Sequence, residues 1–213
     1  MKAMFLRLLI TASTVLWMTT PGTPTSAADL DAATRLAAER VAVGTCANCH
    51  GWRGHSVQPK VPVLAGQHPG YLLAQLKAFK SQTRGDPDAL GYMWGMAGPL
   101  EDSMMAALAD YYSRQTPWAG DRGDPRLTAR GEQIYQHGDA AEGIPPCAAC
   151  HGANAAGTDL YPRLAGQHVQ YLMKQLRSFQ NNLRDVAIMH GVARGLKIQD
   201  MRAVSVYLQS LGS

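Results

Sequence analysis

The chain has 213 residues, of which 20 are Lys or Arg and 16 are Asp or Glu, so its formal net charge is +4. Lys2 and Arg7 lie in an N-terminal segment that we expect to be removed. Without them 18 basic residues remain against 16 acidic ones, and the excess falls to +2. No stripe of basic residues interleaved with aromatic ones is present, which argues against a nucleic acid partner.

The first 28 residues have the layout of a secretory signal peptide. The basic residues Lys2 and Arg7 precede an apolar run at residues 8–18. The small residues that end at Ala28 are typical of a signal peptidase cleavage site. The apolar run is too short to cross a bilayer, and no later run is long enough. We therefore expect residues 1–28 to be cleaved and the mature chain to be exported. An uncleaved amphipathic anchor is the alternative.

The first segment expected to be helical, residues 32–43, ends just before the motif Cys-Ala-Asn-Cys-His at 46–50. A second motif, Cys-Ala-Ala-Cys-His, stands at 147–151, and the two motifs use every cysteine of the chain. Exported thiols pair by default as disulfides, and a zinc site is another interpretation. However, the alternating strand and helix pattern of a redox Cys-x-x-Cys is absent, and zinc fingers space their histidines well away from the cysteine pair.

A histidine directly behind Cys-x-x-Cys is the attachment signature of c-type haem. The two thiols add to the vinyl groups at one edge of the porphyrin, and the adjacent imidazole reaches the iron from one face. We therefore predict two covalently bound haem c groups, each with its iron. The attachment residues and histidine ligands are Cys46, Cys49, Cys147, Cys150, His50 and His151.

The next segment, residues 71–79, has helical periodicity, and its apolar and aromatic face recurs in register at 171–179. The wider stretches 64–80 and 164–180 are identical at 10 of 17 positions. Because the two halves of the chain are this similar, we infer a tandem repeat of one small helical domain. A buried cofactor helps to complete the core of each domain.

The repeat continues to the end of each half. The sequence MWGMAGPL at 93–100 matches MHGVARGL at 189–196, and a further amphipathic helix follows each of these segments. The residues between the halves, TPWAGDRGDP, have the composition of a linker. We predict an all-α protein with a signal peptide at 1–28, haem domains at 29–118 and 126–213, and a linker at 119–125.

The sixth position of each iron decides between an electron carrier and an enzyme. The best candidates are Met93 and Met189, which occupy equivalent places in the repeat. They lie 43 and 38 residues after His50 and His151, respectively. We expect both methionines to lie in loops before the last helix of their domain.

Other sixth ligands stay open at this point. Met96 has no methionine counterpart, and Met105 and Met201 repeat at core spacing within a helix, where methionine is more often packing. His68 and His168 also repeat and would give bis-histidine iron, although their places at helix starts suit a capping or surface role. An iron with an open site is the last alternative.

The paired C-x-x-C-H-G motifs, the P-x-L-A-G-Q runs at 62–67 and 162–167, and the M-x-G-x-A-x-x-L segments resemble the cytochrome c₄ family. The resemblance covers essentially the whole mature chain. It implies two class I cytochrome c domains packed about a pseudo-twofold axis, in a periplasmic protein. It also implies that the carbonyls of Pro62 and Pro162 accept the Nδ1 protons of the haem histidines.

By the same resemblance, the irons are ligated by His50 with Met93 and by His151 with Met189, and the chain is an electron carrier rather than an enzyme. The usual partners of the family are a quinol:cytochrome c oxidoreductase and a terminal oxidase. One alternative is an electron-accepting subunit of a periplasmic dehydrogenase, such as a sulfide-oxidising flavoprotein or an alcohol dehydrogenase. The other is a dihaem peroxidase, which needs an accessible iron.

Overall fold

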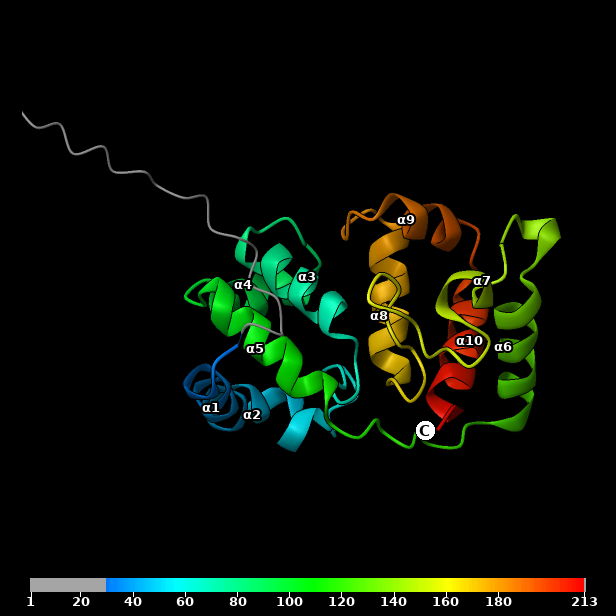
Figure 1. Ribbon diagram of the computed structural model, residues 1–213. Helices are drawn as coiled ribbons and strands as arrows, with labels where there is room; N and C mark the ends of the chain where they lie inside the picture. Colours follow the sequence, from blue (N-terminus) through cyan, green and yellow to red (C-terminus); the bar gives the residue numbers. More distant parts are fainter. Residues whose placement is uncertain (1–29, 213) are drawn as a thin grey trace, which may run out of the picture.

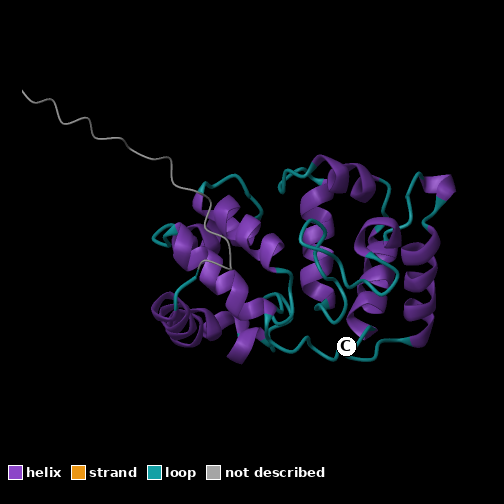
Figure 2. Cartoon of the chain, in the orientation of Figure 1, coloured by secondary structure: helices purple, strands orange, loops and turns teal. Residues whose placement is uncertain are grey.

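The structure is a computed structural model that describes residues 30–212. The predicted signal peptide at 1–28 lies outside the described residues. Between residues 30 and 212 the regular structure is helical, as predicted, apart from one isolated bridge between Asp139 and Ile144 (Figure 2). No helix in that range combines the length and the apolar character that a membrane span needs.

The helices form two successive groups (Figure 1). The first group, called the first domain, contains α1 (Ala32–Val41), π-helical η2 (Ala42–Cys46), α2 (Ala47–His50), 3₁₀-helical η3 (Trp52–Gly54), α3 (Pro69–Lys80), π-helical η4 (Ala89–Met93), α4 (Trp94–Ala97) and α5 (Asp102–Ser113). The second domain contains α6 (Pro125–His137), 3₁₀-helical η5 (Ala140–Glu142), α7 (Ala148–His151), α8 (Val169–Gln180), α9 (Ala187–Arg194) and α10 (Ile198–Ser210).

Both domains begin with a helix that an aspartate caps. The Asp31 carboxylate accepts a hydrogen bond from the Thr34 amide at 2.6 Å, and Asp124 accepts from the amides of Arg126 and Leu127 at 2.9 and 3.1 Å. These bonds satisfy amides that have no partner within the helix, so each aspartate fixes where its helix starts.

The last helix of each domain forms the centre of its core. In the first domain α5 packs against α1 and α3, and in the second α10 packs against α6 and α8. The apolar stripes expected on both helices are buried at Met105, Leu108 and Tyr112 on α5, and at Met201, Val204 and Leu208 on α10. Leu211, expected to end the second stripe, lies just after α10 and is half-buried. Burying one such apolar side chain contributes roughly 1.5–3 kcal/mol, so these stripes hold the helices together.

The two domains lie side by side, with α8 on the side of the second domain that faces the first (Figure 1). The connecting chain runs along one end of both domains, where the Asp121 amide donates to the Gln209 carbonyl at 3.2 Å. The repeated Leu-Ala-Gly-Gln turns also touch this connection. A Cβ added at Gly66 would lie 2.5 Å from Pro117, and Gly66 has φ +67°, so only glycine fits there.

Candidate functional site

The first cysteine motif forms one helical turn. Cys46 ends η2, and α2 carries Cys49 and His50 before Gly51 stops the helix with φ +74°. Residues at i, i+3 and i+4 share one face of a helix. The fold therefore presents both thiols and the imidazole on the same side.

The second motif has the same arrangement on α7. Cys147 precedes the helix, Cys150 and His151 lie in its single turn, and Gly152 ends it with φ +79°. Within residues 30–212 no disulfide joins the four motif cysteines. Burial raises the pKa of the Cys46 thiol, and burial raises that of the Cys147 thiol to about 11.

Each motif histidine is held by a proline carbonyl. The Nδ1 atoms of His50 and His151 lie 3.0 Å from the carbonyl oxygens of Pro62 and Pro162, as the resemblance implied. Because a carbonyl only accepts, Nδ1 carries the proton and Nε2 keeps a lone pair for a metal. Burial lowers the pKa of both imidazoles, which favours the neutral form that binds iron. These two turns fit covalent haem.

The two candidate methionines lie in helical turns, so the expectation that they lie in loops is wrong. Met93 ends η4 and packs against Phe79, Ala89 and Ala97. Met189 lies within α9, and both methionine side chains are half-buried. Neither helix contains proline, and each begins with an alanine, so a short helix can form at both places.

The other methionines lie in different surroundings. Met105 and Met201 are 1% exposed inside α5 and α10, in the apolar core where their spacing placed them. Met96 is 54% exposed. Core packing therefore accounts for the second repeated methionine pair.

A pair of glutamines joins the domains by reciprocal hydrogen bonds. Gln67 bonds both backbone groups of Arg163, accepting from its amide at 2.8 Å and donating to its carbonyl at 2.9 Å. Gln167 does the same with Val63, at 2.9 Å for each bond. Each glutamine side chain thus pairs with both backbone groups of one residue in the other domain. The symmetry of these two pairs supports a pseudo-twofold relation between the domains.

The repeated histidines are part of the same interface. His68 Nε2 lies 2.7 Å from the Ala156 carbonyl, and His168 Nε2 lies 2.8 Å from the Ser56 carbonyl. These bonds also cross the domain boundary and are exchanged between equivalent positions. The interface therefore explains why the two histidines recur, without a role at an iron.

Beyond the histidines, two arginines meet at the boundary. Arg84 and Arg184 are 8% and 6% exposed, and both donate to the side-chain oxygens of Gln75 and Gln175 at 2.8–3.0 Å. Arg184 also donates to the Tyr71 hydroxyl at 2.8 Å. Burial alone would raise the pKa of Tyr71, but the two guanidinium groups lower it overall.

A buried carboxylate pairs with one of these cations. Asp86 is 1% exposed and accepts from Arg84 Nε at 2.7 Å. In the second half the segment between Arg184 and Met189 is shorter, and the acid beside Arg184, Asp185, is exposed. The cluster is thus symmetric in its arginines and glutamines but asymmetric in its acid.

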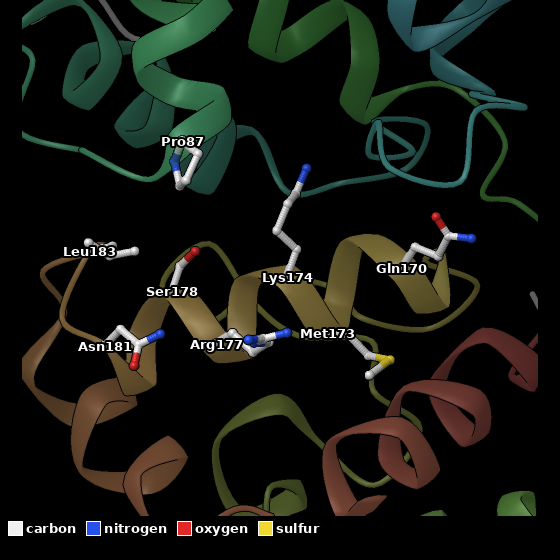
Figure 3. A pocket seen from close by; sticks show the side chains of 8 residues that line it. All are labelled: Pro87, Gln170, Met173, Lys174, Arg177, Ser178, Asn181 and Leu183. Atoms are coloured by element: carbon white, nitrogen blue, oxygen red, sulfur yellow. The ribbon is translucent and has the colours of Figure 1, made fainter. Parts of the chain in front are cut away.

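A shallow pocket opens at the edge of this boundary (Figure 3). In the figure Lys174 and Ser178 point from α8 toward the first domain, where Pro87 lies. Lys174 also forms an ion pair with Asp88 and donates to the Lys60 carbonyl at 2.9 Å. Pro87 of the first domain lines the pocket together with residues of α8, and no residue of the two cysteine motifs does, so the pocket lies at the edge of the domain interface and apart from the motifs.

The interface role of these residues was not predicted from the sequence, although His68 and His168 were candidates for iron ligands. The signal was available, since Gln67, His68 and Arg84 recur as Gln167, His168 and Arg184 at a constant offset of 100. Polar residues that repeat identically at that offset are expected at an interface between two copies of one fold.

The repeated helical domain and its Cys-x-x-Cys-His turn, with a buried and oriented imidazole, define a c-type cytochrome with two haem domains. In agreement, the cytochrome c family model matches residues 36–114 and 128–212. Cytochrome c₄ of Azotobacter vinelandii is 40% identical over 191 residues, which cover 84% of this chain and 90% of that protein. The solved cytochrome c₄ of Pseudomonas stutzeri matches with a TM-score of 0.74 and 39% identity, over 85% of this chain and 99% of that one.

The chain belongs to the cytochrome c₄ family. It carries two covalent haem c groups, which the cysteine pairs of both motifs fit, and it is an electron-transfer protein rather than an enzyme. A further relative is the thiosulfate dehydrogenase electron acceptor of Thiomonas intermedia, 33% identical over 171 residues, or 77% of each chain.

Proposed function

We propose that His50 with Met93, and His151 with Met189, hold the two irons. When bound, haem supplies a one-electron couple, and a thioether as sixth ligand favours the ferrous form and raises the potential. The proposal is supported by the equivalent, half-buried places of the two methionines. It is also supported by the surroundings of the other repeated candidates. Met105 and Met201 are buried in the cores, and His68 and His168 form hydrogen bonds across the interface.

The chain's own residues orient the ligands and keep the site in place. The carbonyls of Pro62 and Pro162 fix the planes of His50 and His151 and increase the electron donation of their free nitrogens. With a histidine and a methionine both bound to the iron, no coordination place would remain for a substrate. Such a site exchanges an electron with little rearrangement, as an electron carrier requires.

The ligand assignment is tested by opening one iron at a time. Met93→Ala and Met189→Ala should each lower one of the two reduction potentials and let half of the haem bind carbon monoxide. Met105→Leu and Met201→Leu are matched controls, since exchanging Met for Leu in a core costs under about 1.5 kcal/mol. Carbon monoxide binding by the controls, or its absence in both alanine variants, would contradict the assignment.

We also propose that the mature chain works in the periplasm after removal of residues 1–28, and carries electrons from a quinol:cytochrome c oxidoreductase to a terminal oxidase. The signal-like N-terminus and the similarity to cytochrome c₄ proteins support this route. N-terminal sequencing of the exported holoprotein tests the cleavage. Quinol-dependent reduction by membranes, followed by reoxidation that an oxidase inhibitor blocks, tests the route. Reduction that needs no quinol would contradict it.

A second candidate function is that of the electron acceptor of a periplasmic dehydrogenase. The relative from Thiomonas intermedia, a thiosulfate dehydrogenase electron acceptor, favours it. Thiosulfate, sulfide or an alcohol, added with a soluble periplasmic fraction, should then reduce the protein without quinol. The same fraction without substrate is the control. Reduction with a single substrate identifies the dehydrogenase class, and none at all removes this candidate.

A further inference from the structure

A tyrosine lies beside the first haem cysteine of each domain, but the two tyrosines come from different helices. In the first domain α5 places Tyr112 in the apolar cluster against which Cys46 packs. In the second domain α6 places Tyr135 in the cluster against which Cys147 packs. The repeat therefore conserves an aromatic side chain at this place in the fold without conserving its position in the sequence.

The exchange is compensated in size. Tyr112 of α5 corresponds to Leu208 of α10 at the offset of 96 that relates the ends of the two halves. Where α6 of the second domain contributes Tyr135, the equivalent first helical segment of the first domain contributes the smaller Val41 and Ala42. A tyrosine thus lies beside the first motif cysteine in each core, and only the helix that supplies it differs.

The two hydroxyl groups differ in their hydrogen bonds. Tyr135 Oη donates to the Gly152 carbonyl at 2.6 Å. Tyr112 is 4% exposed, and its hydroxyl makes no well-aligned hydrogen bond within residues 30–212, although the Cys46 side chain lies close enough to interact with it. A buried hydroxyl without a partner costs about 1–3 kcal/mol, and such groups are rare in folded proteins. The acceptor for Tyr112 is therefore expected in the haem-loaded site.

We propose that Tyr112 donates its hydrogen bond to the Cys46 sulfur once that sulfur is a thioether, and that this bond makes the first haem differ from the second. The inference rests on covalent haem attachment at Cys46. A thioether has lost its own proton and can only accept, whereas a phenol can donate. In the second domain the Tyr135 proton is already committed to Gly152, so the Cys147 thioether lacks such a donor.

The hydroxyl of Tyr112 keeps its proton over the working pH range. Burial, followed by the neighbouring Cys46, raises the pKa of Tyr112 above its ordinary value. The positive end of the O–H dipole then faces the haem edge and stabilises the additional electron of the reduced state. A polar group also makes the site less apolar, which acts in the opposite direction. We expect the oriented dipole to prevail because it lies in contact with the sulfur.

The test is an optically followed redox titration of the Tyr112→Phe holoprotein, after its mass has shown that both haems are attached. Phenylalanine keeps the ring and removes only the hydroxyl. One of the two midpoint potentials should fall, by up to the equivalent of a tenfold change in the reduction equilibrium, which is about 59 mV for one electron. The other potential should stay within error.

Two variants provide matched controls for this result. Tyr111→Phe removes the hydroxyl of the adjacent residue, whose charged neighbours are Glu39 and Arg53, and it should move neither potential. Tyr135→Phe should cost stability without lowering the potential that Tyr112→Phe lowers. The proposal is overturned if Tyr112→Phe leaves both potentials unchanged, shifts them equally, or raises the affected one. A missing haem in the mass would instead count against attachment at Cys46.

Discussion

The two domains are alike in how they hold the motif histidine and in the glutamine and histidine bonds that they exchange. Each imidazole is bonded to a proline carbonyl at 3.0 Å, and each domain offers the same glutamine and histidine to the other. They differ in a buried acid at the interface, Asp86 of the first domain, and in the tyrosine beside the first motif cysteine, which is Tyr112 in one domain and Tyr135 in the other. Symmetric residues assemble the protein, and the asymmetric ones can give its two haems different potentials.

The segments that carry the first-domain haem residues also differ in their helical geometry. The turns η2 and η4 are π-helical and end at Cys46 and Met93, whereas Met189 lies in the regular helix α9. Such π-helical turns are rare and occur often at functional sites. The first site is thus built on less regular backbone than the second.

The largest expected effect comes from removing one attachment site. Cys46→Ala with Cys49→Ala should lose one covalent haem and leave the first domain with an incomplete core, while the second haem stays attached. Mass spectrometry of the purified protein and pyridine haemochrome spectra measure the number of haems. Cys147→Ala with Cys150→Ala is the mirrored control. Loss of both haems from either double variant would show that the domains do not bind haem independently.

Asp86→Asn probes the buried acid that the first domain contributes to the interface cluster. Removing one partner of a buried ion pair costs about 3 kcal/mol or more, because the opposite charge stays buried. Arg84 would keep its bonds to glutamine but lose its counter-ion. Denaturant unfolding of the holoprotein measures this loss. Asp88→Asn, which breaks a more exposed pair with Lys174, should cost under about 1 kcal/mol. Equal losses in both variants would contradict the central role of Asp86.

Gln67→Ala and Gln167→Ala test whether the two glutamines contribute equally to the stability of the interface. Each change removes two bonds across the boundary and leaves an amide and a carbonyl to find water, at a cost of about 1–3 kcal/mol. Because the contacts are equivalent, we expect the two losses in unfolding free energy to agree within about 0.5 kcal/mol. A clear difference between them would show that the interface is not symmetric in energy.

Much of this architecture could be predicted from the repeat. The helical face predicted at 71–79 lies on α3, the same face at 171–179 lies on α8, and the motif spacing alone identifies the haem turns. These predictions depend on local periodicity and on covalent chemistry, which neighbouring residues in the chain determine. The domain boundaries at 118–126 and the signal peptide stay predictions.

The remainder depended on contacts between distant residues. His68 and His168 were candidates for iron because they repeat, and only the packing of the domains showed what their rings bond. Likewise, the difference between Tyr112 and Leu208 is visible in the sequence but has no meaning until Cys46 is placed beside the tyrosine. Repetition in the sequence identifies candidate residues, while the contacts of each residue in the folded protein show its role.

The central claim is that both irons have histidine and methionine as axial ligands. The weak charge-transfer band between thioether sulfur and ferric iron, at the red edge of the visible spectrum, tests it most directly. The intensity of the band per protein should correspond to two sites, with half of it lost in Met93→Ala and half in Met189→Ala. A wild-type protein without the band, or with the band unchanged in both variants, would contradict the claim.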